Sequence, residues 1–460
     1  YTITSGKGQV QIHGDVVFLQ DIQADVKGEH LRVDGTLHHV FDEDPTLQLG
    51  VHLTEWNLAS ILASDVGGYV SADAMLTGPM SNVRGNADVR VRDVTYDGVT
   101  VDRGKAHLAY GDGMIHVSDL DVAVQGGKVE GTGDYDLEKG TYAGNLTLQG
   151  LSLYGLPMSG ALHLGGSISG SVSVEGNSNG ILRMSGQVQG DRIRYESFNF
   201  DAVTASIIWD GSRVTIPYLN GNLGSGSITG HGYVENNQFA VDLYGTKLEL
   251  HDLIHESQPA VEGTISLQLH GEGALDNPTG TVTVEGTSLG YGPTQFERGF
   301  LQAELKDHVL HIMDGYLGYR KSRYTLEGHI GLDDVTDMDV QAKAQDVRIE
   351  DIMPSVADIP VTGWLDTELR LQGTWKDPVL RGHLKAWDGS IYGKLYESIE
   401  GDYFYEGDTL FLPRLEMHTY GGTIVADGQV SKEHVDVNFS GDDLPVEPFI
   451  RDTGVDLKGT

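Results

Sequence analysis

The chain repeats itself with a period of about 98 residues. A nineteen-residue segment that opens apolar-x-apolar and closes on glycine recurs without a gap as Val17–Gly35, Ile115–Gly133, Val214–Gly232, Leu310–Gly328 and Leu410–Gly428. The closing glycines lie 98, 99, 96 and 100 residues apart. A fixed period of this kind indicates a repeat architecture rather than a series of unrelated domains.

A second recurring block has the alternation of a β-strand. It occupies Gly68–Gly78, Gly166–Gly176, Gly263–Gly273 and Gly363–Gly373, with mostly apolar residues at even offsets from the first glycine and polar residues between them. Period-two alternation predicts a strand with one apolar and one polar face. The residues that we expect to line the apolar face are Val70, Leu76, Val172, Val174, Ile265, Leu267, Leu269, Leu365, Leu369 and Leu371.

One short segment in most repeats has helical spacing instead. Apolar residues three and four apart occur in 57–62, 250–254, 349–353 and 446–450, with a weaker match at 153–156. This spacing predicts a short helical turn whose apolar side could cap an open end of the sheet. No repeat has enough sequence left for a second layer of long helices.

The two blocks divide the chain into repeats that abut without a proline-rich or serine-rich linker. We expect a partial first repeat at 1–66, four repeats at 67–164, 165–261, 262–360 and 361–454, and the start of a sixth at 455–460. The chain thus breaks off as a further repeat begins, and we interpret it as a piece of a longer protein. Glycine is abundant, at 62 of 460 residues, which fits many turns between strands.

Three architectures can bury the apolar faces of such strands: separate two-sheet sandwiches, a β-helix, or one long curved antiparallel sheet. The abutting repeats argue against sandwiches, and the long period argues against a β-helix. The expected fold is therefore all-β, a repeating β-groove made of a long curved antiparallel sheet. A lipid-filled groove and a dry, fully packed interior explain the alternation equally well.

Composition limits the function classes. Acidic residues outnumber basic ones by 67 to 31, so the net charge of −36 repels nucleic acid and anionic membrane surfaces. Cysteine is absent, which is compatible with an export compartment. The sequence has no apolar run of eighteen residues, so no transmembrane helix is expected. We expect no nucleic-acid partner, and no phosphate-binding loop or Cys/His cluster is present.

Three motifs could carry chemistry, and each has a simpler interpretation. Gly176–Gly180 matches Gly-x-Ser-x-Gly, but it falls where other repeats have a hairpin turn rather than a strand-to-helix elbow. His251 and His255 have zinc-ligand spacing, and His38 and His39 lie near three acidic residues; no other repeat has either pair. We therefore expect no catalytic residues, no metal and no cofactor.

The repeating features resemble a known family. The Gly-x-apolar strand, the turn that follows it (Gly273–Gly280 and Gly373–Gly382) and the helical step together resemble the AsmA-like superfamily, and the TamB family most closely. The resemblance covers essentially the whole chain. It implies a taco-shaped β-groove in the periplasm of a two-membrane bacterium. The C-terminal domain and the N-terminal membrane anchor of that family are expected to lie outside this chain.

The resemblance also implies a function: a non-enzymatic conduit that carries phospholipid between the inner and outer membranes, with acyl chains in the groove. Some family members are linked instead to outer-membrane protein assembly with a β-barrel partner of the TamA type, so a periplasm-spanning scaffold is the alternative. A surface adhesin made of β-sandwich repeats is a third possibility. The sequence does not choose between the first two roles.

Overall fold

The computed structural model describes residues 3–26, 28–61, 66–96, 98–154, 164–195, 198–253, 261–291, 294–320, 322–332, 337–352, 360–374, 378–406, 409–431, 434–445 and 448. The expected all-β class is confirmed: the described residues form an antiparallel sheet of 28 strands with a few four-residue helices. Two compact units divide the chain, Tyr1–Leu223 with His231–Asn236 and Gly224–Gly230 with Asn237–Thr460. Each unit is described by itself below.

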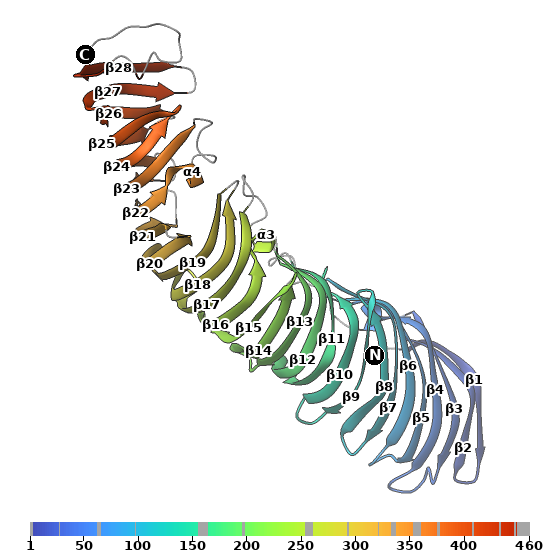
Figure 1. Cartoon of the computed structure of the whole chain (residues 1–460). Helices are drawn as coiled ribbons and strands as arrows, with labels where there is room; N and C mark the ends of the chain where they lie inside the picture. Colours follow the sequence, from blue (N-terminus) through green and yellow to red (C-terminus); the bar gives the residue numbers. More distant parts are fainter. Residues whose placement is uncertain are drawn as a thin grey trace. The chain divides into compact units, whose positions relative to one another are not determined.

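In the first unit, consecutive strands lie side by side in chain order (Figure 1). They are β1 Ile3–His13, β2 Val16–Val26, β3 Glu29–His38, β4 Thr46–Asn57, β5 Gly67–Pro79, β6 Arg84–Tyr96, β7 Val99–Gly111, β8 Met114–Val124, β9 Gly127–Asp136, β10 Thr141–Ser152, β11 Leu164–Asn177, β12 Gly180–Tyr195, β13 Phe198–Trp209 and β14 Arg213–Leu223. Strand β15, Gly226–Glu235, contributes residues to both units.

The second unit continues the same antiparallel order. Its strands are β16 Gln238–Glu249, β17 Val261–Ala274, β18 Asn277–Tyr291, β19 Thr294–Lys306, β20 Val309–Tyr319, β21 Ser322–Gly331, β22 Met338–Arg348, β23 Val361–Gly373, β24 Pro378–Ile391, β25 Lys394–Glu406, β26 Thr409–Thr419, β27 Gly422–Ser431 and β28 Val435–Asp442. The recurring glycine-bounded block lies in β5, β11, β17 and β23, so the same strand returns after every six strands. The repeat boundaries expected from the sequence remain a prediction.

The helical steps occur where the spacing predicted them. Helices α1 (Leu58–Ile61), α3 (Leu250–Leu253) and α4 (Ile349–Ile352) each follow one strand and pack against it and the next. In α1, the Asn57 side chain accepts a hydrogen bond from the Ala59 amide at 3.0 Å and so caps the first turn. Of the expected step at 446–450, only Pro448 is described, and residues 155 and 156 of the weaker match at 153–156 lie outside the described residues.

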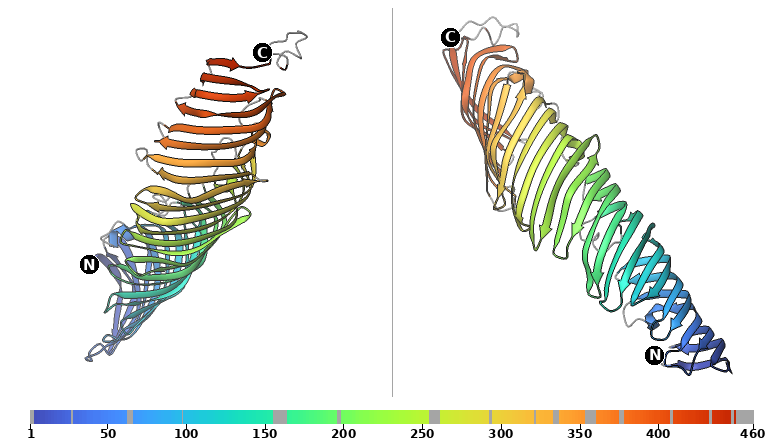
Figure 2. Two further views of the ribbon diagram at one scale, coloured as in Figure 1. Left: turned by 60° about the vertical axis from the view of Figure 1, so that its left-hand side comes forward. Right: turned by 90° about the horizontal axis from the view of Figure 1, so that it is seen from below.

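A recurring β-bulge explains the first glycine of the block. Gly68 has φ +107°, and a Cβ there would lie 2.6 Å from the carbonyl oxygen of Asp93. The backbone of Asp93 is in the left-handed region as well, with φ 51°. Gly263 and Ser288 repeat this arrangement, with φ +125° and 52°. Only glycine fits such a close approach without strain. Bulges bend a strand and increase its twist, and the strands of each unit are visibly bent in Figure 2.

Candidate functional site

The candidate site is the apolar face of the sheet. Residues directly opposite each other in an antiparallel pair point to the same side, so the register defines this face. In the first unit one row runs Val51, Ala74, Ala87, Leu108, Val117, from β4 to β8. In the second unit a row runs Leu243, Leu269, Val282, Ala303, Ile312, from β16 to β20. Each unit therefore has a continuous apolar surface across its strands.

The ten residues expected to line this face all lie on it, in β5, β11, β17 and β23. Ile265 is buried, at 8% exposure, and the other nine are only partly buried. Their cross-strand partners are apolar or glycine: Leu267, for example, lies between Gly245 and Val284. Whether lipid contacts these residues remains a prediction.

The middle of the apolar face is open. In the described residues, the packing contacts of each strand are mainly with its neighbours in the chain, and the helices contact mainly the strands beside them. Among described side chains larger than alanine, only Leu248, Val347 and Thr419 are fully buried. A closed interior would bury the lining residues completely, so this arrangement favours the groove over the fully packed core.

A small core does form at one rim, beneath α4. Ile349 of α4 packs with Ala386, Tyr396 and Ile399 of β24 and β25. The Tyr396 hydroxyl donates a hydrogen bond of 2.8 Å to the carbonyl oxygen of Thr362. Burial, reinforced by the nearby Glu350 and Asp388 carboxylates, raises the pKa of Tyr396 to about 12. The helical step thus closes the end of the apolar face rather than its middle.

The opposite face carries ion pairs and histidine–carboxylate contacts between neighbouring strands. His52 lies 2.9 Å from Asp73, His107 lies 3.0 Å from Asp88, and Lys343 lies 3.2 Å from Glu368. Hydrogen bonds from His52 and from a neighbouring arginine hold the pKa of Asp73 below its usual value. Exposed pairs of this kind add little stability individually. They keep this face hydrated, so the sheet has one apolar face and one polar face.

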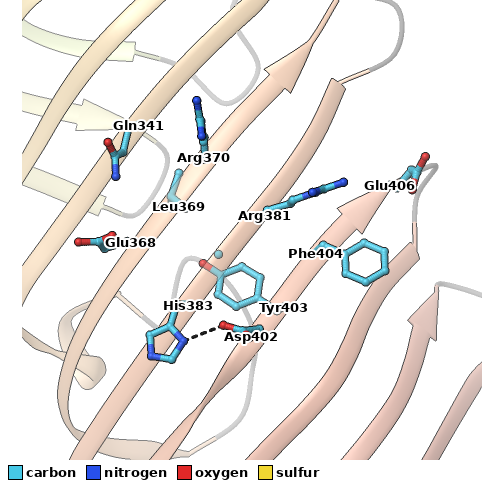
Figure 3. Close-up of a pocket in the computed structure, with 11 residues that line it drawn as sticks. Gln341, Glu368, Leu369, Arg370, Arg381, His383, Asp402, Tyr403, Phe404 and Glu406 are labelled. Atoms are coloured by element: carbon cyan, nitrogen blue, oxygen red, sulfur yellow. Dashed lines mark hydrogen bonds and ion pairs between the residues drawn. The ribbon is translucent and has the colours of Figure 1, made fainter.

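One recess on the second unit is lined by both charged and apolar residues (Figure 3). It has a volume of about 560 Å³ between β22 and β25, with Leu369 and Tyr403 from the apolar face and charged residues from the polar face. Within it, His383 Nδ1 lies 2.7 Å from Asp402, as drawn in Figure 3. The described lining contains no serine, threonine or cysteine that this pair could activate.

The motifs set aside in the sequence have equally simple structures. Gly176–Gly180 forms a hairpin turn between β11 and β12, as expected. His251 pairs with Asp252 at 3.1 Å, while His255 lies outside the described residues. His39 pairs with Asp15 at 3.0 Å, and His38 contacts Thr36. No group of three or more potential metal ligands occurs within the described part of the chain.

The fold and the site define an open, two-sided β-groove protein. A family model, the TamB C-terminal domain, matches residues 20–279, and the chain belongs to the TamB family. The expectation that this domain lies outside the chain is wrong, because the matched stretch begins in β2 and ends in β18, within the repeating strands themselves. Neither a curated protein nor a solved structure matches the chain.

Membership in this family implies a role in transport or assembly in the bacterial envelope rather than catalysis. None of the helices in the described ranges has the length and hydropathy needed to cross a membrane.

Proposed function

We propose that the apolar face binds the acyl chains of phospholipid and conducts them across the periplasm between the inner and outer membranes. The observation that carries the proposal is that nine of the ten expected lining residues are only partly buried on a continuous apolar surface. Exposing such a surface to water is costly, at about 0.8 kcal/mol per CH₂ group that could be buried. Acyl chains would remove this cost for both lipid and protein.

The polar face supports the same proposal. Its paired charges, together with a net charge of −36, keep the outer side hydrated and away from anionic membrane surfaces. Lipid headgroups would remain in water at the open edge of the groove. Nothing in this process requires bond making or breaking, so the proposed role is non-enzymatic.

A photo-crosslinking amino acid at Leu267 would test for lipid in the groove. Leu267 lies on the apolar face, and the adjacent Gln268 lies exposed on the polar face, so Gln268 provides a matched control. We expect phospholipid adducts at Leu267 and none at Gln268, detected by mass spectrometry of protein crosslinked in cells. Protein adducts at Leu267 in place of lipid would instead favour an assembly scaffold with an outer-membrane β-barrel partner.

Charged substitutions would test transport itself. Leu267→Asp and Leu369→Asp place a carboxylate on the apolar face, where desolvation by an acyl chain would be strongly unfavourable. Because both side chains are only partly buried, the fold should survive. We expect lipid transfer between membranes to fall severalfold in each variant and not in Gln268→Asp. Normal transfer in the doubly substituted chain, with its circular dichroism unchanged, would refute the conduit.

A further inference from the structure

The polar face of the first unit contains a cluster of cations on two neighbouring strands. Arg92 lies directly opposite Arg103, and Arg90 lies directly opposite Lys105, so β6 and β7 place four cations in a two-by-two block. Like charges directly opposite each other destabilise a strand pair. The block is also unusual in a chain with more than twice as many acidic as basic residues. Three of these cations have carboxylate partners, Arg92 for example at 3.0 Å from Glu55, so Arg103 is the one whose charge no described side chain balances.

Three of these cations, Arg90, Arg103 and Lys105, border an open recess of about 900 Å³. Its centre is Ala123 of β8, which lies opposite Arg103 on one side and Lys128 on the other. A methyl group between two long cationic side chains leaves space above the sheet. Gly126 and Gly127 of the adjoining turn extend that space. The charged residues of the lining are four cations, Arg90, Arg103, Lys105 and Lys128, and a single carboxylate, Asp121.

Three of the four cations that line the recess have carboxylate partners, and the fourth has none among the described residues. Arg90 is 2.7 Å from Asp73, and Lys128 is 2.5 Å from Glu130. Asp121 is shared, at 3.6 Å from Lys105 and 3.3 Å from Lys128. Arg103 is exposed and makes no hydrogen bond or ion pair with any described residue. The recess therefore has an excess of positive charge.

The recess on the second unit shows that such an excess is not general. Arg370 and Arg381 also lie directly opposite each other there. That recess, however, contains Arg370, Arg381 and His383 together with three carboxylates, those of Glu368, Asp402 and Glu406. Its basic side chains do not outnumber its carboxylates, and Arg370 is hydrogen-bonded to Asp339 at 2.6 Å. Arg381 thus provides a matched arginine in a recess that lacks the charge excess.

We propose that the recess over Ala123 binds a phosphate group. A guanidinium fork together with two ammonium groups suits an oxyanion with several charged oxygens, because arginine binds phosphate through paired hydrogen bonds and lysine through its compact charge. The phosphate group belongs either to a soluble compound or to a lipid headgroup. The site lies on the face opposite the apolar groove, so it does not depend on the proposed lipid conduit.

Isothermal titration calorimetry of the whole chain with inorganic phosphate, at low salt, would test the proposal. We expect saturable binding that Arg103→Gln weakens about tenfold, equivalent to about 1.4 kcal/mol. Arg381→Gln, the matched control, should leave it unchanged. Asp121→Asn should strengthen binding severalfold, because it releases Lys105 and Lys128 from their shared carboxylate. Both arginine side chains are exposed, so neither variant should disturb the fold.

The outcomes separate the sources of the phosphate group. Dihexanoyl phosphatidylglycerol below its micelle concentration would compete with inorganic phosphate if a lipid headgroup fits the site, and its failure to compete would assign the site to soluble phosphates. The proposal would be overturned by the absence of saturable phosphate binding, or by equal effects of Arg103→Gln and Arg381→Gln. Weaker binding in Asp121→Asn would also contradict it.

Discussion

The two units have the same strand order but bury their apolar faces to different extents. In the first unit the buried apolar residues among those described are Ala72, Val124, Ala205 and Leu223. The second unit, of nearly equal length, has thirteen, including four in β22. One repeat pattern can therefore produce either an open apolar surface or a partly filled one. The first unit offers the more accessible face for an apolar ligand.

The difference is clearest at one position that recurs before each helical step. Trp56, Leu151, Leu248 and Val347 occupy it, since each pairs with the same site on the next strand, namely Val70, Ile168, Ile265 and Leu365. In the first unit Trp56 and Leu151 are only partly buried. In the second unit Leu248 and Val347 are completely buried. The position is apolar in every case, but it is completely buried only in the second unit.

The prediction with the largest expected effect concerns Leu248 and Leu151. Leu248→Ala should destabilise the second unit by about 2–5 kcal/mol, because it empties a filled core position. Leu151→Ala, the same substitution in the first unit, should cost only about 1 kcal/mol. Urea unfolding with hydrogen exchange of the amides in β10 and β16 would measure each loss locally. Equal losses would mean that the units are packed alike.

A second test concerns the glycine-containing β-bulge, which both units share. Gly166 has φ +105°, and a Cβ there would lie 2.5 Å from the carbonyl oxygen of Arg192; Gly263 of the second unit is similar. We expect Gly166→Ala and Gly263→Ala to cost about 1–3 kcal/mol each, because both strain the bulge. Denaturation with urea would give the two values. Gly165→Ala is the control, since its Cβ would lie 3.7 Å from the nearest side chain, an ordinary contact.

This second comparison would fail if Gly166→Ala were tolerated as well as Gly165→Ala. The bulge would then not depend on glycine, and the recurrence of this residue would need another cause. A much larger loss in one unit than in the other would show that packing, rather than backbone conformation, decides the cost.

The sequence predicted the strands, the helical steps and the apolar face, because all three depend on local periodicity. It could not predict the bulges, since the left-handed residues opposite the recurring glycines have no common type: Asp93, Arg192, Ser288 and Asp388. Nor could it predict burial, because Leu151 and Leu248 have the same side chain at the same place in the pattern. It also could not predict the cationic recess, since the opposition of Arg90 and Lys105 depends on the strand register.

The prediction with the smallest expected effect concerns tyrosine ionisation in the second unit. Burial raises the pKa of Tyr324 and of Tyr396 to about 12. The folded state therefore favours the neutral phenol relative to the unfolded chain, in which tyrosine ionises near 10. The stability that this burial contributes is complete below about pH 10 and is lost as the pH rises to about 12.

Absorbance at alkaline pH should accordingly show a late ionisation step that Tyr396→Phe reduces. The same substitution removes the hydrogen bond to the carbonyl oxygen of Thr362, so it should also lower stability slightly at neutral pH. Tyr110→Phe, an exposed tyrosine of the first unit at 37% exposure, is the matched control and should leave the late step intact. If Tyr396→Phe left that step unchanged, the rim beneath α4 would be as open to water as the rest of the groove, and the contrast between the units would be smaller than the packing indicates.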